Sequence, residues 1–144
     1  ATQLCKKYGL KLLVENHAHV MSASSEGILR LIEQVNDENL GTNLDIAWAL
    51  IQREDIGLAV HKLKKHLWHL HARDSDCLSC YMFPIGAGVL DWENVIHQLY
   101  QVGYDGFLSL EWMHVARTRE QYAKESLDLL RNLIIKEGAK RGKR

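Results

Sequence analysis

The segment from His66 to Asp74 places two histidines inside an otherwise apolar strand pattern. Because side chains alternate across a strand, His69 and His71 share one face with Leu67, where a core would normally hold hydrocarbon. Three other short apolar runs each end in an acidic residue: Glu15, Asp45 and Glu111. A buried carboxylate without a partner is strongly destabilising, so three of them and an imidazole in equivalent places predict a bound cation.

The segments that must position these groups alternate between strands and helices. Strands are expected at residues 11–16, 42–45, 66–74 and 107–112, and helices at 1–8, 26–36, 56–67, 92–102 and 119–137. Strands that are separated by whole helices predict right-handed crossovers and a parallel sheet, which is an α/β fold. The acidic and imidazole groups would then lie at the C-terminal ends of the strands, where such sheets and barrels hold their sites.

The inward-facing residues distinguish half a barrel from an open, doubly wound sheet. Four βα units are half of an eight-stranded barrel of about 250 residues. Two positions before each rim group, the sequence has a further set of residues that we expect to form one layer beneath it: Leu13, Asn43, His69 and Ser109. Layered inward side chains are typical of barrels, so we predict a (βα)₄ half barrel with open edges at its first and last strands.

Composition limits the classes of partner. The chain has 144 residues, 47% of them hydrophobic, and 18 basic residues balance 18 acidic ones. We therefore expect one domain over residues 1–144 and no affinity for nucleic acid, with a basic tail at 139–144. No apolar run approaches the roughly 20 residues of a membrane span. Three cysteines, including the pair Cys77 and Cys80, fit a reducing compartment, and we expect a cytoplasmic protein.

Five segments together resemble the C-terminal half of the xylose isomerase-like TIM barrels, the sugar phosphate isomerase/epimerase superfamily that also contains the AP endonuclease family 2 enzymes. They occur in the order of that family and span nearly the whole chain: Leu13–His17, Leu44–Trp48, His69–Asp74, Pro84–Trp92 and Gly103–Glu111. The resemblance implies that the four strands are strands five to eight of such a barrel.

The resemblance also implies a metal site and a reaction. In that family these strands supply Glu, Asp, His and Glu to one divalent cation, which here are Glu15, Asp45, His71 and Glu111. Oxygen ligands and one imidazole suit Mn²⁺ or Mg²⁺, with Zn²⁺ or Co²⁺ possible. Such a cation stabilises an enediolate while a carboxylate moves the proton on carbon. Glu15 and Glu111 would be this catalytic pair in an isomerase or epimerase of a sugar or sugar phosphate.

Four residues are expected to contact the sugar: His17, Trp48, Arg73 and Asp74. His69 would lie one layer below His71 and orient a metal ligand. Each of them also has a structural alternative. The rings of the histidines and of Trp48 could be solvated or packed in the core, and Arg73 and Asp74 could form a structural salt bridge. Trp112 could extend the apolar wall that Trp48 begins. The chain departs from many family members at Trp48, where they have histidine, and at Ala87, where they have glutamate.

Two other functions are weighed against the epimerase. A non-catalytic or self-associating half barrel would keep the scaffold and pair with a missing N-terminal half or with a second copy. An AP endonuclease-like phosphoesterase would need three zinc ions and a histidine pair after the seventh strand, and the loop at 75–89 contains no histidine. The expected partners are therefore a small sugar and the other half of a barrel, without a membrane or nucleic acid.

Overall fold

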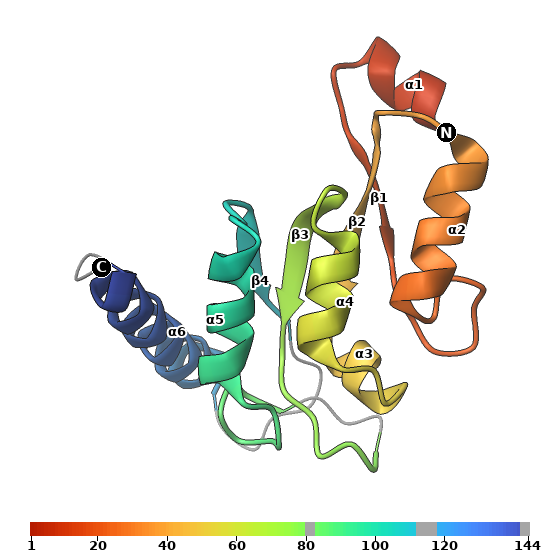
Figure 1. Cartoon of the computed structure of the whole chain (residues 1–144). Helices are drawn as coiled ribbons and strands as arrows, with labels where there is room; N and C mark the ends of the chain where they lie inside the picture. Colours follow the sequence, from red (N-terminus) through yellow and green to blue (C-terminus); the bar gives the residue numbers. More distant parts are fainter. Residues whose placement is uncertain (80–82, 112–117, 142–144) are drawn as a thin grey trace.

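Four parallel strands form one sheet in chain order (Figure 1). The computed structural model describes residues 1–79, 83–111 and 118–141. The strands are β1 (Leu12–Glu15), β2 (Leu40–Asp45), β3 (Leu67–Ala72) and β4 (Phe107–Leu110). Each pairs in parallel with the next one along the chain. The predicted α/β architecture with four βα units and a parallel sheet, matching half of a TIM barrel, is confirmed.

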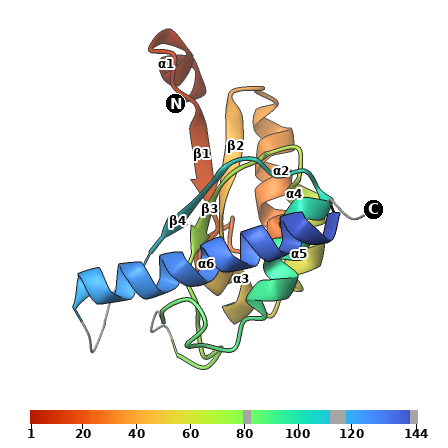
Figure 2. The ribbon, with the colours of Figure 1, turned by 90° about the vertical axis from the view of Figure 1, so that its left-hand side faces the viewer.

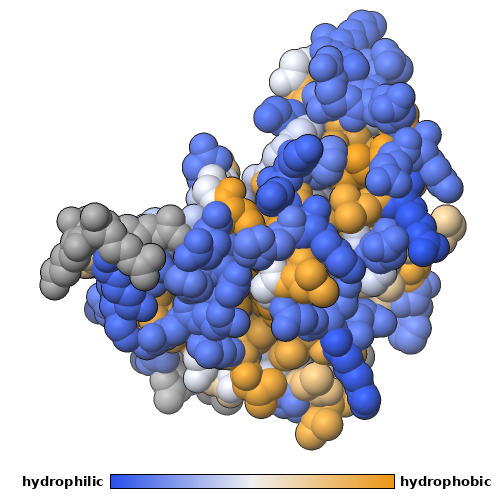
Figure 3. Space-filling model, viewed as in Figure 1, coloured by the Kyte–Doolittle hydropathy of each residue, from blue (hydrophilic) through white to orange (hydrophobic). Residues whose placement is uncertain are grey.

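Six helices accompany this sheet in the described part of the chain. They are α1 (Thr2–Lys7), α2 (Ser25–Val35), α3 (Ile46–Ile51), α4 (Ile56–Leu63), α5 (Trp92–Gln101) and α6 (Arg119–Arg141). Helices α2, α4 and α5 lie side by side on the same face of the sheet (Figure 2), and α6 packs against α5. Their outer surface is mainly hydrophilic, with hydrophobic areas between them (Figure 3). None of the helices in the described ranges is both long and apolar enough to cross a membrane.

Side chains cap the first turns of α2, α3, α4 and α5. Ser24, Asp45, Asp55 and Asp91 each accept a hydrogen bond from a backbone N–H in the first turn of the following helix. Each such cap stabilises its helix by about 1 kcal/mol. The start of the helix expected at residue 92 is confirmed, because Asp91 caps it. The start of the last helix is also confirmed, because the Thr118 hydroxyl accepts from the Gln121 N–H at 3.3 Å.

Several element boundaries differ from the expectation. The helix expected to reach residue 67 ends at Leu63, because Leu67 enters the core as the first residue of β3. Residues 46–51 form a separate short helix, which Asp45 caps. Helix α6 continues to Arg141, so residues 139–141 of the expected basic tail are helical, and residues 142–144 lie outside the described part of the chain.

The strands are staggered along one another rather than aligned, and the expected inner layer of Leu13, Asn43, His69 and Ser109 stays a prediction. Asn43 pairs with His69, whereas Leu13 pairs with Gly41 and His69 pairs with Phe107. Neighbouring strands of a barrel tilt and shift along one another, and a count from each strand end cannot register that shift. The stagger lets residues from different heights along their strands meet at one rim.

The two outer strands leave the sheet open on both sides. Within the described ranges β1 pairs only with β2, and β4 pairs only with β3. Phe107 on β4 is 77% exposed. The predicted open edges at the first and last strands are confirmed, and such edges favour pairing with a further strand.

Candidate metal centre

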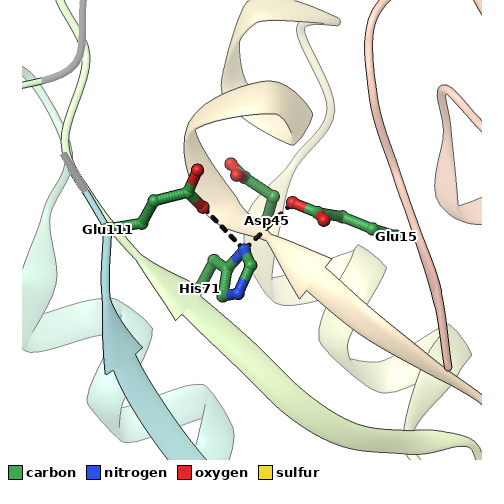
Figure 4. A group of neighbouring side chains, drawn as sticks. All are labelled: Glu15, Asp45, His71 and Glu111. Atoms are coloured by element: carbon green, nitrogen blue, oxygen red, sulfur yellow. Dashed lines mark hydrogen bonds and ion pairs between the residues drawn. The ribbon is translucent and has the colours of Figure 1, made fainter. Parts of the chain in front are cut away.

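Glu15, Asp45, His71 and Glu111 converge at the C-terminal rim of the sheet (Figure 4). Each can offer one ligand atom, and these atoms all lie within 4.8 Å of one another. Glu15 and Asp45 end β1 and β2, His71 is the next-to-last residue of β3, and Glu111 directly follows β4. The convergence that the sequence predicted is present in the structure, while the role of these residues as ligands stays a prediction.

Two carboxylates face the same nitrogen of His71. Nδ1 lies 3.0 Å from Oε1 of Glu15 and 2.7 Å from Oε2 of Glu111. A neutral imidazole carries one N–H, so Nδ1 can donate to one oxygen and not fully to both. Oε2 of Glu111 is buried and accepts no hydrogen bond from any described residue. A buried acceptor without a donor is destabilising, and a cation between these groups would relieve it.

The carboxylate of Asp45 is the most buried member of the cluster. Its side chain has no exposed surface, and Oδ1 accepts from the Trp48 N–H at 2.9 Å. Burial raises the pKa of Asp45 to about 6, and this effect outweighs the Arg73 guanidinium and the Trp48 N–H, which both lower it. The donor set of three carboxylates and one imidazole, with buried acceptors that lack donors, fits a divalent cation.

Asn16 fixes the rim ends of β1 and β2 to each other, a role that the sequence reasoning missed. Its amide donates to the backbone carbonyl of Asp45 at 2.8 Å and accepts from the Asp45 N–H at 2.7 Å. Asn16 is fully buried. It therefore continues the strand pairing one residue beyond Glu15 and holds Glu15 and Asp45 at the same rim. The only signal in the sequence is its place directly after the acidic end of a strand.

Arg73 lies behind the cluster, against two of its carboxylates. One guanidinium nitrogen forms an ion pair with Oδ2 of Asp45, and the other lies 3.7 Å from Oε1 of Glu111. The guanidinium also lies over the Trp48 ring, 5.2 Å from its centroid, and only 1% of the side chain is exposed. This burial differs from the open position that a sugar contact would need. The structure therefore places Arg73 where it orients carboxylates.

Asp74 turns away from the rim into the loop that follows β3. Its carboxylate is fully buried and accepts from four donors: the backbone N–H groups of Ser75, Gly86 and Leu90 and the indole N–H of Trp92. A Cβ at Gly88 would lie 2.2 Å from Oδ1 of Asp74, so the loop needs glycine there. This full set of donors and this burial speak against the sugar contact expected for Asp74, which instead organises the loop.

The remaining predicted residues surround the cluster. The exposed ring of His17 lies 4.4 Å from the Trp48 ring, and Trp48 packs with Ala18 and Ile51 in a small apolar cluster. His69 meets His71 edge to face, with ring centroids 5.5 Å apart. Burial, followed by the neighbouring His71, lowers the pKa of His69, which favours its neutral form. Cys80 and Trp112 lie outside the described residues.

Comparison with known proteins agrees with this geometry. The family model described as xylose isomerase-like TIM barrel matches residues 1–133. An uncharacterised protein of Methanocaldococcus jannaschii is 24% identical over 146 residues, covering 92% of this chain and 47% of that protein. Fructoselysine 3-epimerase of Escherichia coli O157:H7 is 24% identical over 140 residues, covering 92% of this chain and 51% of the enzyme.

A solved structure has the same fold over most of the chain. The crystal structure of a D-tagatose 3-epimerase-like protein superposes with a TM-score of 0.83 at 24% identity, covering 96% of this chain and 52% of that protein. At this identity the likeness shows the fold alone. The chain spans about half the length of the curated relatives it matches.

Proposed function

Because the chain belongs to the xylose isomerase-like TIM barrel family, we propose that it forms the metal-binding half of a divalent-metal-dependent isomerase or epimerase of a sugar or sugar phosphate. The convergence of Glu15, Asp45, His71 and Glu111 within 4.8 Å is the observation that carries this proposal. The names of two similar proteins, a fructoselysine 3-epimerase and a D-tagatose 3-epimerase-like protein, support the substrate class.

The four rim residues would hold one cation, with Mn²⁺ or Mg²⁺ the best fit to their oxygens and Zn²⁺ or Co²⁺ the alternatives. When bound, such a cation polarises a sugar carbonyl and stabilises the negative charge that develops on its oxygen. Glu15 and Glu111 approach the centre from the two outer strands, on either side of His71 (Figure 4). We assign them the proton transfer, in which one carboxylate takes a proton from carbon and the other returns one.

Trp48 and His17 would form the sugar-facing wall beside these carboxylates. An aromatic face covers the C–H side of a sugar, and an exposed imidazole can donate to or accept from a hydroxyl. The 4.4 Å contact joins the exposed ring of His17 to the buried ring of Trp48, which is 7% exposed. Arg73 would stay behind the carboxylates, and Asp74 would keep the loop after β3 in place.

Strands five to eight of a barrel are the part that we assign to this chain. The open edges of β1 and β4 would pair with an N-terminal half barrel or with a second copy of the chain. These same edges favour the second candidate, a non-catalytic half barrel that only associates. We do not propose the phosphoesterase, because the described residues offer a single four-residue metal cluster rather than a three-metal site.

Solvent-proton exchange tests the proposed chemistry in the whole protein. With Mn²⁺, a panel of free and phosphorylated ketoses in deuterium oxide should gain deuterium on the carbon next to the carbonyl, as followed by NMR. Glu15→Gln and Glu111→Gln should each lower this exchange by about 100-fold or more, because each removes a proton carrier. Glu38→Gln is the matched control, since Glu38 is 92% exposed and precedes β2, at the opposite end of that strand from Asp45. Exchange that survives both rim substitutions would contradict the assignment, and Mn²⁺ binding without exchange on any ketose would favour the associating half barrel.

A further inference from the structure

Arg73 is the positive charge that faces the metal cluster from within the protein. Its guanidinium lies against Asp45 and Glu111, and the side chain is 1% exposed. With a neutral His71, three carboxylates and one guanidinium give the cluster a formal charge of −3 + 1 = −2. This charge matches one divalent cation, because Arg73 neutralises the one negative charge of the three carboxylates that the two charges of the cation would leave over.

The two carboxylates beside Arg73 each have a different neighbour at each oxygen. In Asp45, Oδ1 accepts from the Trp48 N–H at 2.9 Å and Oδ2 faces the guanidinium. In Glu111, Oε2 points to His71 Nδ1 at 2.7 Å while Oε1 lies 3.7 Å from the guanidinium. A planar guanidinium presents its N–H groups in a fixed fork, so it can hold both orientations at once.

We propose that Arg73 is a positioning residue that restricts Asp45 and Glu111 to one oxygen each toward the cation, and thereby selects a small six-coordinate ion over Ca²⁺. Ca²⁺ takes six to eight oxygens and commonly binds carboxylates through both oxygens, whereas Mg²⁺ and similar ions need few protein ligands in a strict octahedron. The inference rests on the proposed metal-dependent function and adds the residue that sets its ion preference.

The test compares the binding of two ions in the whole protein. Mn²⁺ and Ca²⁺ dissociation constants are measured by competition with a fluorescent chelator, without substrate. Arg73→Met keeps the apolar stem and removes the fork. We expect it to weaken Mn²⁺ by about 10- to 100-fold, the range found when a partner of a metal ligand is removed. Ca²⁺ should bind as well as before or better, so the ratio of Ca²⁺ to Mn²⁺ dissociation constants should fall at least tenfold.

Two further variants separate orientation from charge and from folding. Arg73→Lys keeps the charge without the fork, so its ratio should lie between those of the wild type and Arg73→Met. Arg30→Met is the control, because Arg30 is 72% exposed and pairs only with Glu26 among the described ion pairs. Circular dichroism checks that each variant is folded, and if Arg73→Met is not, the ratio in Arg73→Lys decides.

Failure of this inference differs from failure of the proposed function. If the wild type binds neither ion, the metal-dependent function is wrong, and the inference falls with it. If the wild type binds Mn²⁺ and the Arg73 variants weaken both ions by the same factor, Arg73 only supports the fold, and the inference alone is overturned. A ratio that stays at the wild-type value in folded Arg73→Lys and Arg73→Met overturns it as well.

Discussion

Two aspartates of this chain, Asp45 and Asp74, are equally buried but belong to opposite kinds of site. Asp74 accepts from four N–H donors of its own loop and of Trp92. Asp45 accepts from one backbone N–H, and its other oxygen faces a guanidinium and a cluster of further carboxylates. A buried carboxylate that accepts a full set of hydrogen bonds stabilises the structure. A buried carboxylate that has few donors and lies next to other carboxylates is typical of a ligand-binding site.

The largest effect should come from removing the satisfied carboxylate. Asp74→Ala leaves three backbone N–H groups and one indole N–H buried without acceptors. We expect the free energy of unfolding to fall by roughly 3–5 kcal/mol, measured by urea denaturation. Asp105→Ala, at an exposed residue between α5 and β4, is the matched control and should change it by less than about 0.5 kcal/mol. A loss for Asp74→Ala as small as that of the control would break the comparison between the two aspartates.

The stability of the metal-free protein should depend on pH through the buried carboxylate of Asp45. Burial raises the pKa of Asp45 to about 6, above the value of 3.8 that an aspartate has in the unfolded chain. The folded protein therefore binds this proton more tightly, and its stability rises as the pH falls from 7 through 6 toward 4. Relative to Asp45→Asn, the wild type should gain up to about 3 kcal/mol over this range.

Urea denaturation at pH 7, 6, 5 and 4 with a chelator present measures that difference. Both proteins share every other titrating group, so the difference between them isolates Asp45. A difference that is constant with pH would mean that the Arg73 guanidinium and the Trp48 N–H offset the effect of burial, so that the pKa of Asp45 is the same in the folded and unfolded protein. A difference that grows as the pH rises would mean that folding lowers the pKa of Asp45 instead of raising it. Asp45 would then resemble Asp74, a carboxylate whose hydrogen-bond partners are all supplied by the protein.

The sequence allowed the acidic cluster to be predicted, but not the partners that distinguish the two aspartates. Short apolar runs that end in Glu15, Asp45 and Glu111 locate the rim, because parallel strands bring their C-terminal ends together. The role of Asp74 depends on a loop that returns from Gly86 and Leu90, twelve and sixteen residues away, to its carboxylate. The path of such a loop is not encoded in a periodic pattern.

The stagger of the strands could not be predicted from the sequence either. Each strand was predictable from its own residues, whereas the pairing of Leu13 with Gly41 depends on how two strands shift along each other. Gly41 also lies close to β3, since a Cβ there would clash with the Trp68 ring of that strand. A contact of that kind joins distant parts of the chain, and a single sequence gives no measure of it.

The smallest effect should come from Asn16, which is satisfied like Asp74 but serves the unsatisfied site. Asn16→Ala removes two hydrogen bonds to the backbone of Asp45, so we expect a loss of about 2 kcal/mol in unfolding free energy. It should also weaken Mn²⁺ by about tenfold, because Glu15 and Asp45 lose their common anchor. Thr42→Val is the matched control, since it removes one hydrogen bond from the same strand pair, to the Val14 carbonyl, below the rim. It should lower stability by about 1 kcal/mol and leave Mn²⁺ affinity unchanged. Equal changes in Mn²⁺ affinity in the two variants would show that Asn16 supports only the sheet. The positions of Glu15 and Asp45 at the rim would then not depend on the hydrogen bonds of Asn16.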